Sequence, residues 1–397
     1  MNGSTLLSGH QPSFFHAGIL AKRIALDKRT EGSKSSGIWL VADQDINDPG
    51  LIEYPDLESE GNLVKRAWNV LPRRIGVPTS AYPWEKPTPP PEVSSQLPPS
   101  VHAGLDRMYN ALIQADGETV ADRFHNATEL MLGELVEKPC ALVKASTLLD
   151  TKSGQDALEK ISSEPLACAL TWNDAIRVAN RSARELKHAG RDEADIEAPV
   201  WVLDSNSRRQ RGTVADVRAH LQGKQRVLPR AFLMTAIARA ELCEEMIHGT
   251  GGAQYEEVTR QWAESFLGFK LAPITVVTAT LRLPLHEYAP ASHSAPSIDD
   301  IRRIEHDPWP NHRDKMRWVE KIEAAPARSD NRSKLFLEMH KEMKELRAPL
   351  DAKISEMQVS RRAAQAAETR LQIAEDRTWP WPLHDEDSLR RLASDIN

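Results

Sequence analysis

The sequence is poor in cysteine and has no long apolar run. Its three cysteines, Cys140, Cys168 and Cys243, show no CxxC spacing, which argues against a disulfide scaffold, a cysteine-rich zinc site and a thioredoxin-like motif. No run reaches the about 18–20 apolar residues of a membrane-spanning helix. Residues 1–11 also lack the basic and apolar regions of a signal peptide. We therefore expect a cytoplasmic protein with no membrane association.

An excess of positive charge is missing as well. The chain has 51 Lys and Arg against 57 Asp and Glu, a formal net charge of −6. Such a chain has no bulk positive field for non-specific binding to nucleic acid or an anionic membrane. We expect neither of these partners, and a small-molecule substrate instead. The 397 residues are enough for about two or three domains with a sizeable core.

Short apolar runs bounded by turn residues predict strands of a parallel sheet that is buried on both faces. Thr5–Leu7 and Gly37–Ala42 flank a helical segment, Phe14–Leu26, and form a βαβ unit. Further strand candidates are 140–143, 199–203 and 274–278. Helices are expected between them at Ser100–Ala115, Thr119–Glu137, Trp172–Ala189, Arg230–Ile247 and Tyr255–Phe266. The fold class is therefore α/β, with a Rossmann-like core over residues 1–285.

Two proline-containing breaks divide the chain. Residues 77–99 hold eight of the 26 prolines, which favour extended backbone and predict a linker within the core. Such a segment is either a surface crossover or a partner-binding proline motif. The second break, at 284–296, precedes a helical appendage over residues 286–397.

Apolar side chains recur every eleven residues in this appendage, at Leu335, Met339, Met343, Leu346, Leu350, Ile354 and Met357. That period predicts a long, nearly straight or slightly right-handed helix over 331–377, kinked at Pro349. One narrow stripe needs a partner, either another helix within 298–325 or a second subunit, and we expect a homodimer through this coiled-coil region. Trp379 and Trp381 are bulky anchors that we expect to dock the tail onto the domain.

The first strand ends in the turn Ser8-Gly9-His10-Gln11-Pro12. Ligands of open parallel sheets bind at this edge, where helix N-termini present free N–H groups. His10 suits a general acid or base, and Gln11 suits a hydrogen bond to a substrate. His16 lies in the first turn of the following helix and joins the same site. The alternative is a helix-capping turn with a structural histidine.

A second polar turn follows the next predicted strand. Asp43-Gln44-Asp45 comes directly after the second strand, and its carboxylates suit an ammonium group, a ribose hydroxyl or a divalent metal. We assign no metal to Asp43 and Asp45, and no particular cofactor. In a right-handed βαβ unit, His10 and Asp43 open onto the same crevice. The alternative is a solvated acidic turn.

A glycine-rich turn, with Gly249, Gly251 and Gly252, could cradle an anion at a helix N-terminus. It lacks the spacing and lysine of a P-loop and the last glycine of GxGxxG. The flanking polar residues favour a binding site over a plain helix-to-helix turn, and they are His248, Tyr255 and Glu256.

Two clusters of arginine occur in this chain of net negative charge. Arg230 follows a proline at a predicted helix start, and its fork suits a carboxylate or phosphate near the site. The run Arg208–Arg211 is interpreted as a solvated loop.

Taken in order, three of these motifs resemble the bacillithiol synthase family, the cysteine-adding enzymes of bacillithiol biosynthesis. Gly9-His10-Gln11-Pro12 is similar to the family's Gly-Gln-Gln-Pro turn, with His10 in place of the first glutamine. Ala42-Asp43-Gln44-Asp45 is similar to its Glu-Asp-His-Asp motif, with Gln44 in place of the histidine. Gly251-Gly252-Ala253 with Tyr255 is similar to its glycine-containing loop. The resemblance covers the first about 60 residues and 227–285.

The resemblance implies a Rossmann-like core with inserted connecting segments and a helical coiled coil used for dimerisation. It also implies a reaction that joins cysteine to the amine of a glucosaminyl malate, here in a divergent and shorter member. We therefore expect a ligase that condenses a cysteine-like amino acid with a small amine. In it, Asp43 and Asp45 hold an ammonium group, His10 and His248 transfer protons, and Arg230 with the glycine turn binds anionic groups. The alternative is a non-catalytic nucleotide- or metabolite-binding protein, or an assembly protein, with the same fold.

Overall fold

The computed structural model describes residues 4–31, 35–59, 61–138, 140–178, 183–253, 255–289 and 295–396. The chain forms two compact units. The first unit comprises Met1–Glu60, Val64–Pro284 and Asp376–Asn397, and the second comprises Gly61–Leu63 and Leu285–Glu375. No helix in the described ranges combines the length and apolarity that crossing a bilayer requires.

The first unit is built on a five-stranded sheet in the order β10-β9-β1-β2-β5, and every neighbouring pair is parallel. This confirms the predicted α/β fold class. The strands are β1 Thr5–His10, β2 Ser36–Val41, β5 Ala141–Lys144, β9 Glu245–His248 and β10 Ile274–Val276. Strand β1 lies between β9 and β2. The chain continues from β1 to its neighbour β2 on one side, and β9, on the other side of β1, is added much later in the sequence. This is a topological switch point, where open α/β sheets form a ligand crevice.

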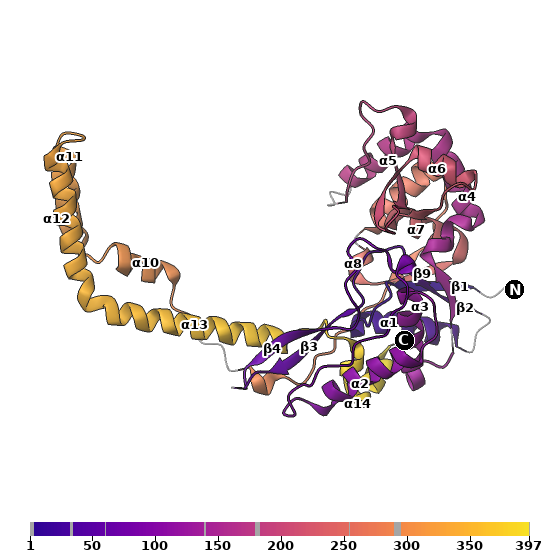
Figure 1. Cartoon of the computed structure of the whole chain (residues 1–397), viewed down its shortest axis with the longest axis horizontal. Coiled ribbons are helices and arrows are strands. Elements are labelled where there is room, and N and C mark those ends of the chain that lie inside the picture. The colour runs from indigo at the N-terminus through magenta and orange to yellow at the C-terminus, as the bar shows by residue number, and fades with distance from the viewer. Residues whose placement is uncertain are drawn as a thin grey trace. The chain divides into compact units, whose positions relative to one another are not determined.

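Helices cover both faces of this sheet, so neighbouring residues of a strand enter different cores. Leu6 and Trp39 belong to a core with helix α1, Ala17–Thr30, which lies along the sheet (Figure 1). Leu7 and Leu40 belong to the other core. Strands with no solvent face must be apolar on both sides, which explains the short apolar runs in the sequence.

The remaining strands of the first unit form two smaller sheets. A hairpin pairs β3 with β4, and a three-stranded sheet has the order β7-β6-β8 with antiparallel pairs. Their bounds are β3 Leu51–Leu57, β4 Leu63–Asn69, β6 Glu197–Leu203, β7 Arg209–Thr213 and β8 Val227–Pro229. The other helices of this unit are α2 Pro99–Gln114, α3 Val120–Leu132, α4 Lys152–Ser163, α5 Pro165–Val178, α6 Val214–Leu221, α7 Ala231–Ile237, α8 Thr250–Ala253, α9 Glu256–Trp262 and α14 Glu386–Asp395.

Three predicted elements of the core were wrong in type or place. The helix expected over Trp172–Ala189 is α5, which begins at Pro165 and ends at Val178, and residues 183–189 are not helical. The other two elements pair with distant strands. The helix expected over Arg230–Ile247 ends as a π-helical turn at Ala238–Leu242, and its last residues form strand β9 instead. Strand 199–203 exists as part of β6, but it lies in the antiparallel sheet. In both cases pairing with strands distant in sequence overrides the local pattern.

The second unit contains the predicted long helix, which runs through α12 Asp330–Arg347, a 3-10 turn Ala348–Leu350 and α13 Asp351–Ala374. It bends at the turn that contains Pro349, as predicted (Figure 1). The helices α10 Ile298–His306 and α11 His312–Ala324 pack against α13 and α12 respectively. The apolar stripe therefore has its helical partner within the same chain.

The C-terminal tail returns to the first unit, so the appendage expected over 286–397 is shorter and ends at Glu375. Trp379 and Trp381 are fully buried, and the backbone N–H of Trp381 donates to the backbone carbonyl of Phe15 at 2.9 Å. Pro380 forms a β-bridge with His16, next to the N-terminus of α1. The tail is thereby tied to the segment between β1 and α1.

We expect Gly104 of α2 to be required for this docking. A Cβ atom at Gly104 would lie 2.3 Å from the carbonyl oxygen of Pro382 and 2.8 Å from the Cα of Leu383. Gly104→Ala should lower the free energy of unfolding by about 1–2 kcal/mol, because the overlap outweighs the gain in helix propensity. Denaturant unfolding measures this, with Asn110→Ala on the exposed face of α2 as the control. A Gly104→Ala variant more stable than wild type would contradict the tight contact.

Candidate functional site

A cavity of about 520 Å³ lies at the switch point, where β1, β2 and β9 end. Its volume is typical of pockets that hold a small metabolite. Nine of the twelve predicted site residues line it: His10, Gln11, His16, Asp45, His248, Gly249, Gly251, Gly252 and Tyr255. The three polar turns, which are far apart in sequence, therefore meet around one cavity.

Three predicted residues do not line this cavity, because each is bound to a neighbour elsewhere. The Asp43 carboxylate accepts hydrogen bonds from the backbone N–H and hydroxyl of Ser146, at 2.7 and 2.6 Å. Arg230 is buried and forms an ion pair with Glu197 at 2.7 Å. Burial raises the pKa of Asp43, while the bonds from Ser146 act in the opposite direction. Asp43 and Arg230 therefore tie neighbouring segments together outside the cavity lining.

Glu256, the third such residue, orients a residue that does line the cavity. Its carboxylate is buried and contacts both the Arg239 guanidinium and His248 Nε2, the latter at 3.3 Å. His248 Nδ1 lies 3.1 Å from the carbonyl oxygen of Gly249. Since each ring nitrogen already faces an acceptor, His248 is held in place and is poorly suited to the proton transfer expected of it.

His10 differs from His248, because only one of its ring nitrogens has a hydrogen-bond partner among the described residues. Its Nδ1 lies 3.1 Å from the Gln11 carbonyl, which can only accept, so Nδ1 carries the hydrogen and Nε2 the lone pair. Burial, and then the nearby Lys22 ammonium, lowers the pKa of His10 to about 3. His10 is therefore neutral at physiological pH. Its ring is fixed edge-on against Phe15, at 5.7 Å between ring centroids.

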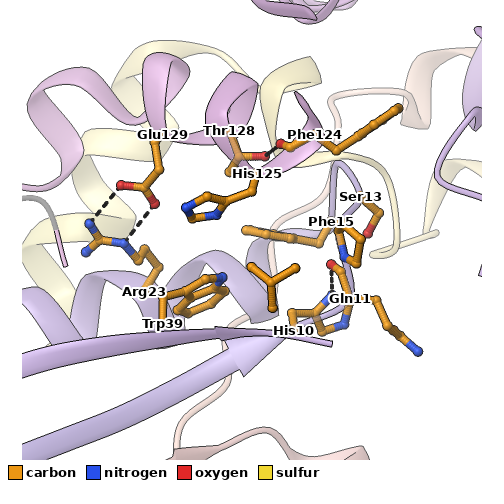
Figure 2. A pocket seen from close by; sticks show the side chains of 12 residues that line it. His10, Gln11, Ser13, Phe15, Arg23, Trp39, Phe124, His125, Thr128 and Glu129 are labelled. Carbon is orange, nitrogen blue, oxygen red and sulfur yellow. Dashed lines mark hydrogen bonds and ion pairs between the residues drawn. The ribbon is translucent and has the colours of Figure 1, made fainter. Parts of the chain in front are cut away.

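His10 also lines a second, much smaller cavity of about 10 Å³ on the side of α1 and α3, room for about one water molecule (Figure 2). Arg23 and Glu129 form an ion pair at its far end, and His125 and Trp39 lie between this pair and His10 (Figure 2). This second cavity lies beside the His10 ring and is too small for a metabolite.

Lys22 lines the main cavity and was not predicted. It lies on α1, one turn after Gly18, is only 4% exposed, and its Nζ donates to the Gly9 carbonyl at 2.6 Å. No carboxylate pairs with it among the described residues. Burial lowers the pKa of Lys22 to about 8. A buried ammonium without a counter-ion is costly, so it indicates a place for a ligand anion.

Two more groups on this side of the cavity are basic. His16 caps α1, accepting a hydrogen bond from the Gly18 N–H at 3.0 Å through Nδ1. Burial, followed by the nearby Arg377 guanidinium, lowers the pKa of His16. Arg377 lines the cavity from the C-terminal tail. With the positive end of the α1 dipole, this wall favours negative charge.

The sequence carried a weak signal for Lys22 and none for Arg377. Lys22 and Arg23 interrupt an otherwise apolar helical run, Ile19–Leu26, which is unusual for the buried face of a helix. Arg377 reaches the cavity only because the tail docks beside His16. A third missed residue, Arg209, contacts Asp45 at 3.2 Å, so the interpretation of Arg208–Arg211 as a solvated loop was wrong at this position.

Within the described ranges, no group of three or more His, Cys, Asp or Glu side chains has an arrangement that could hold a metal ion. Comparison of the chain with protein-family models and with curated proteins finds no match.

We expect Gly252 to be needed for the position of His248. A Cβ atom at Gly252 would lie 1.6 Å from Cε1 of the His248 ring, whereas one at Gly251 would meet nothing within 4 Å. Gly252→Ala should displace the ring, break its contact with Glu256 and lower the unfolding free energy by about 1–3 kcal/mol. Gly251→Ala, in the same short helix, is the matched control in thermal or denaturant unfolding. Equal stability of the two variants would show that the ring moves aside at no cost.

Proposed function

We propose that the chain is a cytoplasmic ligase of the bacillithiol synthase type, which condenses a cysteine-like amino acid with a small amine in the main cavity. The observation that carries the proposal is the Lys22 ammonium, buried in the cavity wall without a carboxylate partner among the described residues. A substrate carboxylate would supply the missing negative charge. The resemblance of the three lining turns to that family supports the choice of reaction.

The basic wall suits a carboxylate substrate for a second reason. Lys22 and Arg377 line the same cavity and carry positive charge, and the N-terminus of α1 adds its partial positive charge, whereas the lowered pKa of His16 keeps its ring neutral. A carboxylate or phosphate bound there would make charge-assisted hydrogen bonds, which are worth about twice as much as neutral ones.

In the proposed reaction, the amine nitrogen attacks the carboxyl carbon and a C–N bond forms. The bond from this carbon to one carboxylate oxygen breaks, and the oxygen leaves as water with the two protons that the attacking ammonium group gives up. The attacking ammonium must first lose a proton, and His10 Nε2 carries a lone pair that can accept it. Burial, the larger cause of the lowered pKa of His10, persists when a bound anion offsets the effect of Lys22, so His10 can pass the proton on but does not hold it.

We expect Lys22→Met to abolish most of the affinity for the amino acid. L-cysteine and a glucosaminyl malate at millimolar concentration should each raise the Tm of the wild type, by linkage of binding to folding. Loss of the ammonium should weaken cysteine binding about 10- to 100-fold, as for other charged hydrogen bonds. Only the ammonium form attracts an anion, so wild-type affinity should fall as pH rises through about 8. The variant should show no such fall.

The control for this measurement is Lys28→Met, near the other end of the same helix and outside the cavity lining. Removing a buried ammonium should not unfold Lys22→Met, so its Tm without ligand should equal or exceed that of the wild type. Incubation of both ligands with and without ATP, followed by mass spectrometry, tests for the amide product. Binding without product would favour a metabolite-binding protein, and the absence of any ligand-dependent Tm change in the wild type would rule out the proposal.

We also propose that the chain forms a homodimer through the long helix. Apolar side chains outside the covered stripe support this, because Leu337 and Val359 are 71% and 64% exposed and Phe336 is 41% exposed. Phe336 and Leu337 are neighbours on α12, and adjoining exposed apolar side chains are typical of an interaction surface.

Sedimentation at micromolar concentration should show a dimer for the wild type and mainly monomer for Leu337→Glu, because a carboxylate would be desolvated in the interface. Lys334→Glu, an exposed charge change on the same helix, should leave the dimer intact. A monomeric wild type would contradict the proposal.

A further inference from the structure

Arg209, from the small antiparallel sheet, is connected to the cavity through two side chains. Its guanidinium stacks on Trp201, with its central carbon 4.1 Å from the ring centroid. The same group donates to Asp45 Oδ1 at 3.2 Å and to the backbone carbonyl of Gln44 at 2.8 Å. Arg209 therefore holds the turn after β2 by a charge-assisted bond and a backbone bond at once.

The Asp45 carboxylate is in turn occupied on both oxygens. Its Oδ1 also accepts from the N–H of Ile46 at 2.8 Å, and its Oδ2 accepts from Nε2 of Gln11 at 2.6 Å. A carboxylate oxygen can only accept, so this short bond requires the NH₂ group of Gln11 to face Asp45. The carbonyl oxygen of the Gln11 amide is left as the acceptor on a residue that lines the cavity.

We propose that Gln11 Oε1 forms a subsite for the amino group of the ligand, and that Asp45 and Arg209 are positioning residues that keep this acceptor turned to the ligand. The proposal deepens the proposed function and rests on it for the identity of the ligand as an amino acid. It changes the role of Asp45, which orients the amide and does not hold the ammonium group itself.

The charges around Gln11 agree with this choice of ligand group. Asp45 is neutralised by Arg209, so no free carboxylate competes with the substrate carboxylate for Lys22. Without Asp45, the Gln11 amide could rotate and offer a donor as readily as an acceptor. The chain of contacts therefore determines whether the cavity distinguishes an amino acid from a carboxylic acid that lacks the amino group.

Titration calorimetry with two probes tests the subsite. L-cysteine and 3-mercaptopropionate share a thiol and a carboxylate, and only cysteine has the amino group. The wild type should bind cysteine about tenfold more tightly, the effect of one hydrogen bond to a charged group. Gln11→Met and Asp45→Asn should each remove this preference while leaving the affinity for 3-mercaptopropionate unchanged. Arg209→Ala should also remove the preference, and it should weaken the binding of both probes because the Asp45 carboxylate is then no longer neutralised.

Matched variants separate positioning from a loss of folding. Arg208→Ala, the exposed neighbour of Arg209 in sequence, should keep the preference. If Arg209→Ala fails to fold, Arg209→Lys, which keeps the charge but loses the planar fork, should show a reduced preference at a wild-type Tm.

Each result decides one of the claims. If the wild type prefers cysteine but the Asp45 and Arg209 variants keep that preference, their positioning role is overturned. If the wild type binds both probes equally, the amino-group subsite is overturned and the proposed function stands. If the wild type binds neither probe, the proposed function fails and the assignment of an amino-group subsite fails with it.

Discussion

The parallel pairing of β1 with β2 on one side and with β9 on the other is the constraint on which the cavity depends. In a parallel sheet all strands end at the same edge, so the turns after these three strands must meet there. The register pairs His10 with Val41, one residue before the turn that contains Asp43. Gly249 follows β9 directly, and α1 leaves the same edge with its positive end at the cavity. Residues separated by about 240 positions in sequence thus become one site without any special loop.

Charge pairing distinguishes the walls of the cavity from the place where a ligand binds. Arg230 pairs with Glu197, and Arg239 pairs with Glu256, so these buried guanidinium groups are compensated within the chain. Lys22 is equally buried, but its Nζ contacts only the Gly9 carbonyl and the face of the Trp39 ring, and no carboxylate among the described residues pairs with it. Pairing a buried charge within the chain offsets most of its desolvation cost, whereas a buried charge that is left unpaired destabilises the free protein. Under the proposed function a substrate anion removes that cost, which is why Lys22 marks the proposed binding wall better than the arginines do.

The sequence was informative where local patterns decide the structure. His10, Gln11 and Asp45 were predicted because each follows an apolar run within a few residues. Since parallel strands end at the same edge of the sheet, these residues were then expected to lie close together. The same reasoning missed β9, since the helical periodicity of the preceding segment continues into it and only pairing with β1 and β10 makes it a strand. Arg209 was missed because its stacking partner and its acceptor lie in other elements. Asp43 was placed near the correct edge, but the choice between cavity and wall depends on Ser146, about 100 residues later.

The C-terminal tail belongs to the unit that holds the cavity, although it follows the helical unit in the sequence. Leu285–Glu375 of the second unit lies between two stretches of the first, since the chain returns to the first unit at Asp376. The tail then places Arg377 at the cavity and buries Trp379 and Trp381 beside the start of α1. The long helix is therefore an insertion into the domain that holds the site, and the final residues complete a wall begun by the first strand. A site assembled from both ends of the first unit requires the whole unit to be folded before a ligand can bind.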